Sequence, residues 1–154
     1  MFRGINSLSL DIKGRMAVPS RYRERLLVDA NSQIIITINP DPDNPCLWLY
    51  PLPVWEAVEH ILDGLPSLDK AAQKIRRLLI GHATECELDG QGRLLVPPPL
   101  RAMAKLDKQI ALVGQGKKFE IWDEPTWAAH RDGWLAEDIK EYTELADGMK
   151  TLSL

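Results

Sequence analysis

Two copies of one short motif carry the residues of this sequence that are best suited to chemistry. Each copy has the pattern D-x-x-G-R-x-x-x-P, beginning once at Asp11 and once at Asp89. An aspartate four residues before an arginine can pin a turn through a salt bridge. An arginine can also bind phosphate or guanine through two parallel hydrogen bonds. The motif therefore favours either a purely structural turn or a turn that contacts nucleic acid.

The first copy of the motif is richer in positive charge than the second. It carries Lys13 and Arg15, whereas the second carries Gln91 at the lysine position, followed by Arg93. We expect Lys13 and Arg15 to contact DNA, and Arg93 either to contact DNA or only to stabilise its turn. Two further basic residues of the amino-terminal region are candidate DNA contacts, Arg3 and Arg21.

The remaining motif positions are expected to be structural. The aspartate would pin the turn, the glycine would supply a positive φ there, and the proline would occupy the first helical turn, where its missing N–H is not needed. These structural positions are Asp11, Gly14, Pro19, Asp89, Gly92 and Pro97.

The two motifs belong to a longer internal duplication. The stretch Leu10–Arg23 matches Leu88–Arg101 at a constant separation of 78 residues. The match continues at a changing separation and ends at a shared P-x-W, from Pro53 and from Pro125. The changes in separation fall in expected turns and loops, where insertions are tolerated. The chain is therefore a tandem repeat of one unit.

Each unit is expected to be mainly β with short helices, an α+β class. The first unit has expected strands at Ser7–Asp11, Arg15–Val18, Ile34–Ile38 and Leu47–Tyr50 and expected helices at Ser20–Val28, with Leu26 and Leu27 on one side, and Val54–Leu62. The second has expected strands at Cys86–Asp89, Arg93–Val96, Ile110–Val113 and Phe119–Trp122 and expected helices at Leu100–Lys105 and from Thr126 to Lys140 or beyond.

Between the two units lies an amphipathic segment that predicts a helix with Ser67 as its N-cap. Its apolar residues are expected to pack on the core and its basic residues to face solvent. The expected organisation is a first module at 1–63, this connecting helix at 64–84, a second module at 85–142 and a tail at 143–154. Because one unit has too little apolar surface to fold alone, we expect the strands of the two units to interlock.

Composition is typical of a globular protein, with 45% hydrophobic and 27% charged residues. The net charge of −3 argues against nucleic acid, but its distribution does not. Residues 1–26 hold six basic and two acidic residues, whereas residues 120–147 hold nine acidic and two basic ones. A basic front can bind phosphate despite an acidic back, because salt screens charge over roughly 10 Å. The sequence lacks an apolar run that would span a bilayer and a signal peptide, so we expect a cytoplasmic protein without a membrane partner.

Nothing in the sequence predicts an enzyme, a cofactor, a metal site or a small-molecule substrate. The three histidines are scattered, and His82 near Cys86 lacks further ligands for a metal. The phosphate-binding and nucleophile motifs of common enzyme classes are absent. Cys46 and Cys86 are expected to be reduced and partly buried, and the tryptophans of the two P-x-W pairs to pack each module rather than to stack on bases.

Several segments together closely resemble the MraZ family: MFRG, LDIKGRMAVPSRYR, LDGQGRLLVPPPLRAMAKL and FEIWDEPTW, with similarity extending to about Tyr142. The resemblance implies two tandem swapped-hairpin modules of the AbrB/SpoVT type, forming a double β-barrel-like fold, and a homo-oligomeric ring of subunits. It also implies a nucleoid-associated repressor that binds short direct repeats of double-stranded DNA at the promoter of the cell-division and cell-wall gene cluster. The family's DNA contacts map onto Lys13, Arg15 and Arg93.

Three alternatives stay open at this point. An antitoxin could use the same swapped hairpin and neutralise a toxin through its tail, although two motifs and a continuous amphipathic ending argue against it. A structural oligomer would have both motif arginines in salt bridges and would not bind DNA. A hydrolase is a distant third.

Overall fold

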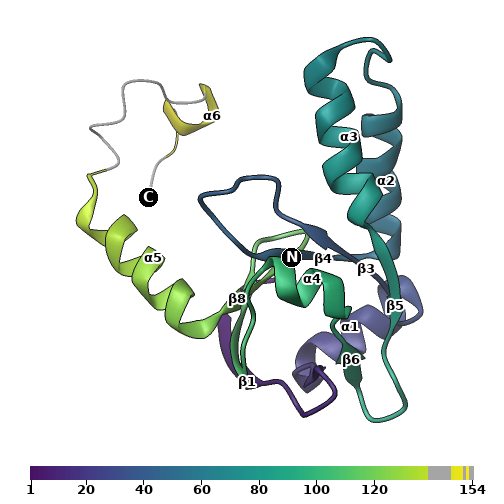
Figure 1. The fold of residues 1–154 in the computed structure, drawn as a ribbon. Coiled ribbons are helices and arrows are strands. Elements are labelled where there is room, and N and C mark those ends of the chain that lie inside the picture. Colours follow the sequence, from purple (N-terminus) through teal and green to yellow (C-terminus); the bar gives the residue numbers. More distant parts are fainter. Residues whose placement is uncertain (139–146, 151, 153–154) are drawn as a thin grey trace.

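The computed structural model describes residues 1–138, 147–150 and 152, and it shows short helices around antiparallel strands (Figure 1). The first half contains β1 (Ile5–Ser9), β2 (Arg15–Ala17), α1 (Ser20–Ala30), β3 (Gln33–Ile38), β4 (Leu47–Pro51) and α2 (Leu52–Asp63). The helix α3 (Lys70–His82) leads to β5 (Thr84–Glu87), β6 (Arg93–Leu95), α4 (Pro98–Met103), β7 (Gln109–Gly114), β8 (Phe119–Asp123) and α5 (Glu124–Ala136), and α6 (Asp147–Lys150) follows. Apart from α3 and α6, the two halves repeat the same order of elements, as a tandem duplication predicts.

The strands form two sheets in which the halves of the chain exchange strands. A six-stranded sheet has the order β1-β7-β8-β4-β3-β5, and β2 pairs with β6 in a separate two-stranded sheet. The first strand of each half thus pairs with the hairpin of the other half, β1 with β7 and β5 with β3. The two halves are interlocked. The closed barrel that the resemblance implies stays a prediction, since this sheet has β1 and β5 as its edge strands.

The register of the strand pairs shows that the halves are related by an approximate twofold axis. In β2–β6, Met16 lies opposite Leu94, and these residues hold the same place in the two motifs. In β4–β8, Trp48 lies opposite Glu120, and each stands five residues before the proline of its P-x-W. Pairs of equivalent positions face each other only where such an axis passes between the strands. The duplication seen in the sequence is therefore also a symmetry of the fold.

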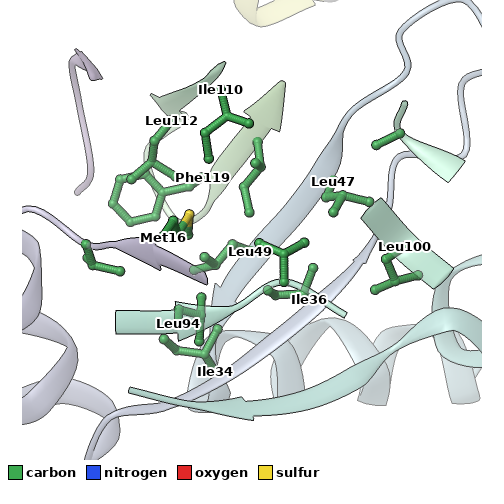
Figure 2. Packing of buried hydrophobic residues seen from close by; sticks show 14 of the residues in the cluster. Met16, Ile34, Ile36, Leu47, Leu49, Leu94, Leu100, Ile110, Leu112 and Phe119 are labelled. Atoms are coloured by element: carbon green, nitrogen blue, oxygen red, sulfur yellow. The ribbon is translucent and has the colours of Figure 1, made fainter. Parts of the chain in front are cut away.

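The main hydrophobic core is built by both halves together (Figure 2). Met16 and Leu94 are fully buried at its centre, beside Ile36 of β3 and Ile110 of β7, all with 0% exposure. Neither half could keep these side chains from water without the other. The small size of each unit is thus compensated by a shared interior.

The tryptophans of the P-x-W pairs pack within the protein, as predicted. Trp55 of α2 lies 5.5 Å from Tyr50, measured between ring centroids, and Trp127 of α5 lies 5.7 Å from Trp122. Tyr50 and Trp122 are equivalent positions of the two halves. Each P-x-W therefore anchors a helix on the last strand of its hairpin.

Several expected boundaries are wrong for identifiable reasons. The strand expected at Ser7–Asp11 is β1, which ends at Ser9 because the Asp11 carboxylate accepts hydrogen bonds within the following turn. The N-cap of α3 is Asp69 rather than Ser67, since the Asp69 side chain accepts a 2.8 Å bond from the Ala72 N–H. Pro19 and Pro97 are N-caps with extended ψ, one position before the first helical turn.

Two helices also differ from the prediction. In α1, Leu26 is buried but Leu27 is 58% exposed, because consecutive helical residues point about 100° apart. α5 begins at Glu124 and ends at Ala136, with an extended backbone at Glu137; the predicted continuation to Lys140 lies outside the described residues. No helix within the described ranges combines the length and the apolarity that crossing a bilayer requires.

Candidate nucleic-acid interface

The first motif folds into a turn that is held by its aspartate. Asp11 Oδ1 accepts hydrogen bonds from the backbone N–H groups of Lys13 and Arg15, each at 2.9 Å, and Oδ2 accepts one from Arg15 Nε at 2.7 Å. Gly14 has a φ of +83°, as the motif predicts, and its N–H donates to the Asp11 carbonyl. One carboxylate thus pins the turn and also orients the arginine side chain.

The second motif folds in the same way. Asp89 accepts 2.9 Å bonds from the N–H groups of Gln91 and Arg93 and from Arg93 Nε, and Gly92 has a φ of +73°. The two turns therefore share one backbone design. They differ in the side chains that the turn presents.

Both motif arginines lie on the outer face of the β2–β6 ribbon. The inner face carries the buried Met16 and Leu94, so the flanking residues of each strand point outward. Arg15 pairs with Leu95, and Ala17 pairs with Arg93, which puts the two arginines on one diagonal of this face. Their side chains are 29% and 32% exposed. Since each uses only Nε for its aspartate, the Nη groups make no hydrogen bond to the described residues.

The two turns carry different charge. Hydrogen bonds from the Arg15 backbone and side chain and from the Lys13 backbone lower the pKa of Asp11 to about 2, and equivalent bonds lower the pKa of Asp89. Both carboxylates are thus ionised at neutral pH. The first turn has two cations against one carboxylate, and the second has one against one. Among the motif residues themselves, only those of the first turn carry an excess of positive charge.

Each turn is covered by an arginine from the other half of the chain. A Cβ at Gly14 would lie 1.8 Å from Arg101 Nη1, and a Cβ at Gly92 would lie 2.0 Å from Arg23 Cδ. Arg23 Nη1 also donates a 3.3 Å bond to the Gln91 carbonyl. Neither contact was predicted from the sequence. The sequence feature that could have pointed to these contacts is that Arg23 and Arg101 hold equivalent positions in the repeat.

The family model described as "MraZ protein, putative antitoxin-like" matches the chain twice, at residues 1–78 and 79–146. Each match contains one copy of the motif. The chain belongs to the MraZ family.

Full-length relatives in this family carry the name "Transcriptional regulator MraZ". The chain is 53% identical over 154 residues to the relative from Thioalkalivibrio sulfidiphilus and 50% identical over 154 residues to that from Halorhodospira halophila, with both chains covered completely. It is 57% identical over 144 residues to the relative from Methylococcus capsulatus, covering 94% of this chain and 93% of the relative. The MraZ family thus accounts for both halves of the chain.

The remaining two candidate contacts of this MraZ chain, Arg3 and Arg21, lie apart from the turns. They line a pocket of about 360 Å³ with Met1, Tyr22 and Arg25. Arg21 Nη2 donates to Asn6 Oδ1 at 2.9 Å and to Tyr22 Oη at 2.7 Å. The strand β1 (Ile5–Ser9) lies between Arg3 and the first turn. The structure therefore brings together Lys13, Arg15 and Arg93, but not Arg3 and Arg21.

The described part of this MraZ chain contains no group of three or more potential metal ligands. His82 Nδ1 lies 2.7 Å from the Leu78 carbonyl within α3. Both cysteines are free; Cys46 is buried and Cys86 partly so, as expected. Burial raises the pKa of both thiols, that of Cys86 to about 11, so neither forms an appreciable amount of thiolate at neutral pH.

Acidification is expected to loosen the first turn of this MraZ chain between about pH 4 and pH 2. The pKa of Asp11 falls from 3.8 to about 2 in the fold. The stabilisation by its carboxylate is therefore complete above pH 3.8 and is lost as the pH falls through about 2. NMR titration of the Lys13 and Arg15 amides should report a midpoint near 2. Asp11→Asn should abolish this response, whereas Asp89→Asn should leave it; a midpoint near 4 would show that the carboxylate is not held.

Proposed function

We propose that this MraZ protein is a sequence-specific DNA-binding transcriptional repressor that reads DNA with the β2–β6 ribbon. The observation that carries the proposal is the outer face of that ribbon, where Arg15 and Arg93 lie on one diagonal, each pinned by an aspartate with its Nη groups available. The name of its relatives, transcriptional regulator, agrees with this function. The site of action is the nucleoid in the cytoplasm.

The geometry suits the major groove. A two-stranded β-ribbon fits this groove, and arginine can bind guanine O6 and N7 through two hydrogen bonds. The aspartates hold the Nε end of each guanidinium, so less side-chain entropy is lost on binding than for a free arginine. Lys13, exposed beside Arg15, is placed to contact the phosphate backbone. The first turn is thus the stronger contact and the second the weaker one.

The proposed target is the promoter of the cell-division and cell-wall gene cluster, bound at short direct repeats by a homo-oligomeric ring. One subunit offers few phosphate contacts, so its own affinity for DNA would be modest. A ring that meets several spaced repeats makes the later contacts intramolecular, with avidity gains of roughly 10²–10⁴. We also propose that the strands of the two modules close into the swapped-hairpin barrel that the resemblance implies.

The test is DNA binding by the purified full chain. A fragment from upstream of its own gene should be shifted and protected at regularly spaced sites, and light scattering should show an oligomer. A promoter reporter should fall when the protein is supplied. If the upstream fragment binds no better than an unrelated fragment of equal length, the proposed function is wrong.

An antitoxin is the second candidate, because the description of the matching family model includes the term antitoxin-like. This function predicts a toxin gene beside the gene for this chain and a stable complex between the two products. A gene at the head of a cell-wall synthesis cluster favours the repressor instead.

Lys13→Gln is expected to weaken binding to all DNA sequences alike. The substitution copies Gln91 of the second turn and removes one phosphate contact in each bound subunit. The slope of log K against log salt should become shallower by about 0.9 for each subunit engaged. Fluorescence anisotropy at several salt concentrations measures this slope. The reciprocal variant Gln91→Lys should steepen it, and an unchanged slope in Lys13→Gln would remove Lys13 from the interface.

A further inference from the structure

The tip of the first turn carries an isoleucine whose side chain is left uncovered by the part of the chain that the structure describes. Ile12 is 101% exposed, more than any other large hydrophobic residue that the structure describes. It stands between Asp11 and Lys13, whose carboxylate and N–H are joined by a 2.9 Å hydrogen bond. Its backbone is therefore held firmly while its side chain lies in water. Such an aliphatic group gains nothing for the fold.

The second turn has no such group. Its equivalent position is Gly90, where an added Cβ would meet no heavy atom within 4 Å and where φ lies outside the left-handed region. A side chain would therefore fit at this position. The difference between the two turns is a difference of sequence that the backbone does not impose.

We propose that Ile12 contacts a thymine methyl group in the major groove and is a specificity-determining residue of the first turn. The proposal rests on the proposed function. The C5-methyl of thymine is the only apolar group that a base pair offers in this groove, and aliphatic side chains recognise it by contact. Lys13 and Arg15 beside Ile12 favour a polyanion as the partner of this tip. An apolar protein surface would desolvate Lys13 and the Nη groups of Arg15 without giving them an anionic partner.

The experiment uses the stretch of upstream DNA that the full-length protein protects from cleavage. Two synthetic duplexes of this stretch are compared, one with thymine and one with deoxyuridine at every thymine, which deletes only the methyl groups. The wild-type chain should bind the deoxyuridine duplex about fourfold more weakly for each methyl contacted. Ile12→Ala should bind the thymine duplex more weakly than the wild type and should bind both duplexes with the same affinity.

Leu68→Ala is the matched control, because Leu68 is another isolated aliphatic residue, 89% exposed and outside the turns. Its ratio of affinities for the thymine and deoxyuridine duplexes should equal that of the wild type. Thermal melting should show that both variants are folded. If Ile12→Ala has the same ratio of affinities for the two duplexes as the wild type, the inference is wrong although the repressor function stands. If the wild-type chain binds neither duplex above an unrelated one, the repressor function fails as well.

Discussion

Arg15→Ala is expected to abolish sequence-specific binding to the upstream DNA. A bidentate contact between arginine and a base contributes about 1–3 kcal/mol of discrimination, or about 5- to 150-fold in affinity. A ring that engages several repeats loses this contact in every bound subunit, so the losses multiply. Titration of a labelled upstream fragment by anisotropy measures the effect. Because Arg15 points outward from the ribbon and its side chain bonds only Asp11 among the described residues, the oligomer should stay intact by light scattering.

Arg93→Ala is the matched comparison for this prediction. Arg93 has the same geometry in the second turn, but that turn carries Gln91 where the first carries Lys13, so the loss of Arg93 should reduce affinity less. Unchanged affinity in Arg15→Ala would remove the ribbon from the DNA interface. Equal losses in the two variants would contradict the proposed inequality of the turns.

Leu94→Ala is expected to destabilise the whole chain by about 2–5 kcal/mol, the usual range for truncating a buried leucine to alanine. Leu94 has 0% exposure and faces Met16 on the approximate twofold axis, where both halves meet. The loss should therefore appear as one earlier unfolding transition in urea, not as the separate unfolding of one half.

The next residue supplies the control for Leu94→Ala. Leu95 lies on the outer face of the same strand with 47% exposure, so Leu95→Ala should change the stability by less than about 0.5 kcal/mol. Equal destabilisation by both variants would contradict the assignment of the two faces. Two resolved transitions in Leu94→Ala would contradict the shared core.

The parts of the fold that depend on local sequence could be predicted. The D-x-x-G-R pattern specifies its turn through contacts within five residues, and the positive φ of Gly14 and Gly92 follows from it. Strand exchange was expected only in general terms, from the small size of each unit. Which strands pair could not be predicted from the sequence. Nothing in the short β1 identifies β7, about a hundred residues away, as its neighbour.

The candidate site was predictable to the same extent. The turn residues follow from the motif, but Arg101 acts on a glycine in the other half of the chain, and no local pattern reveals such a contact. Arg21 was assigned to DNA on charge alone, whereas two hydrogen bonds tie it to Asn6 and Tyr22. Charge in a sequence shows which residues are able to bind phosphate. It does not show which of these side chains already form hydrogen bonds within the folded protein.

The approximate axis through β4–β8 has a consequence for chains of this design. A dimer of two identical single-motif chains must place identical residues across such an axis, where tryptophan would face tryptophan and glutamate would face glutamate. Joining both copies in one chain removes this demand for self-complementarity. Here Trp48 Nε1 donates to Glu120 Oε2 at 3.4 Å, a pair that no exact homodimer could form at its axis. Fusion likewise lets one turn keep Ile12 and Lys13 while the other has Gly90 and Gln91, so a symmetric scaffold can carry an asymmetric recognition surface.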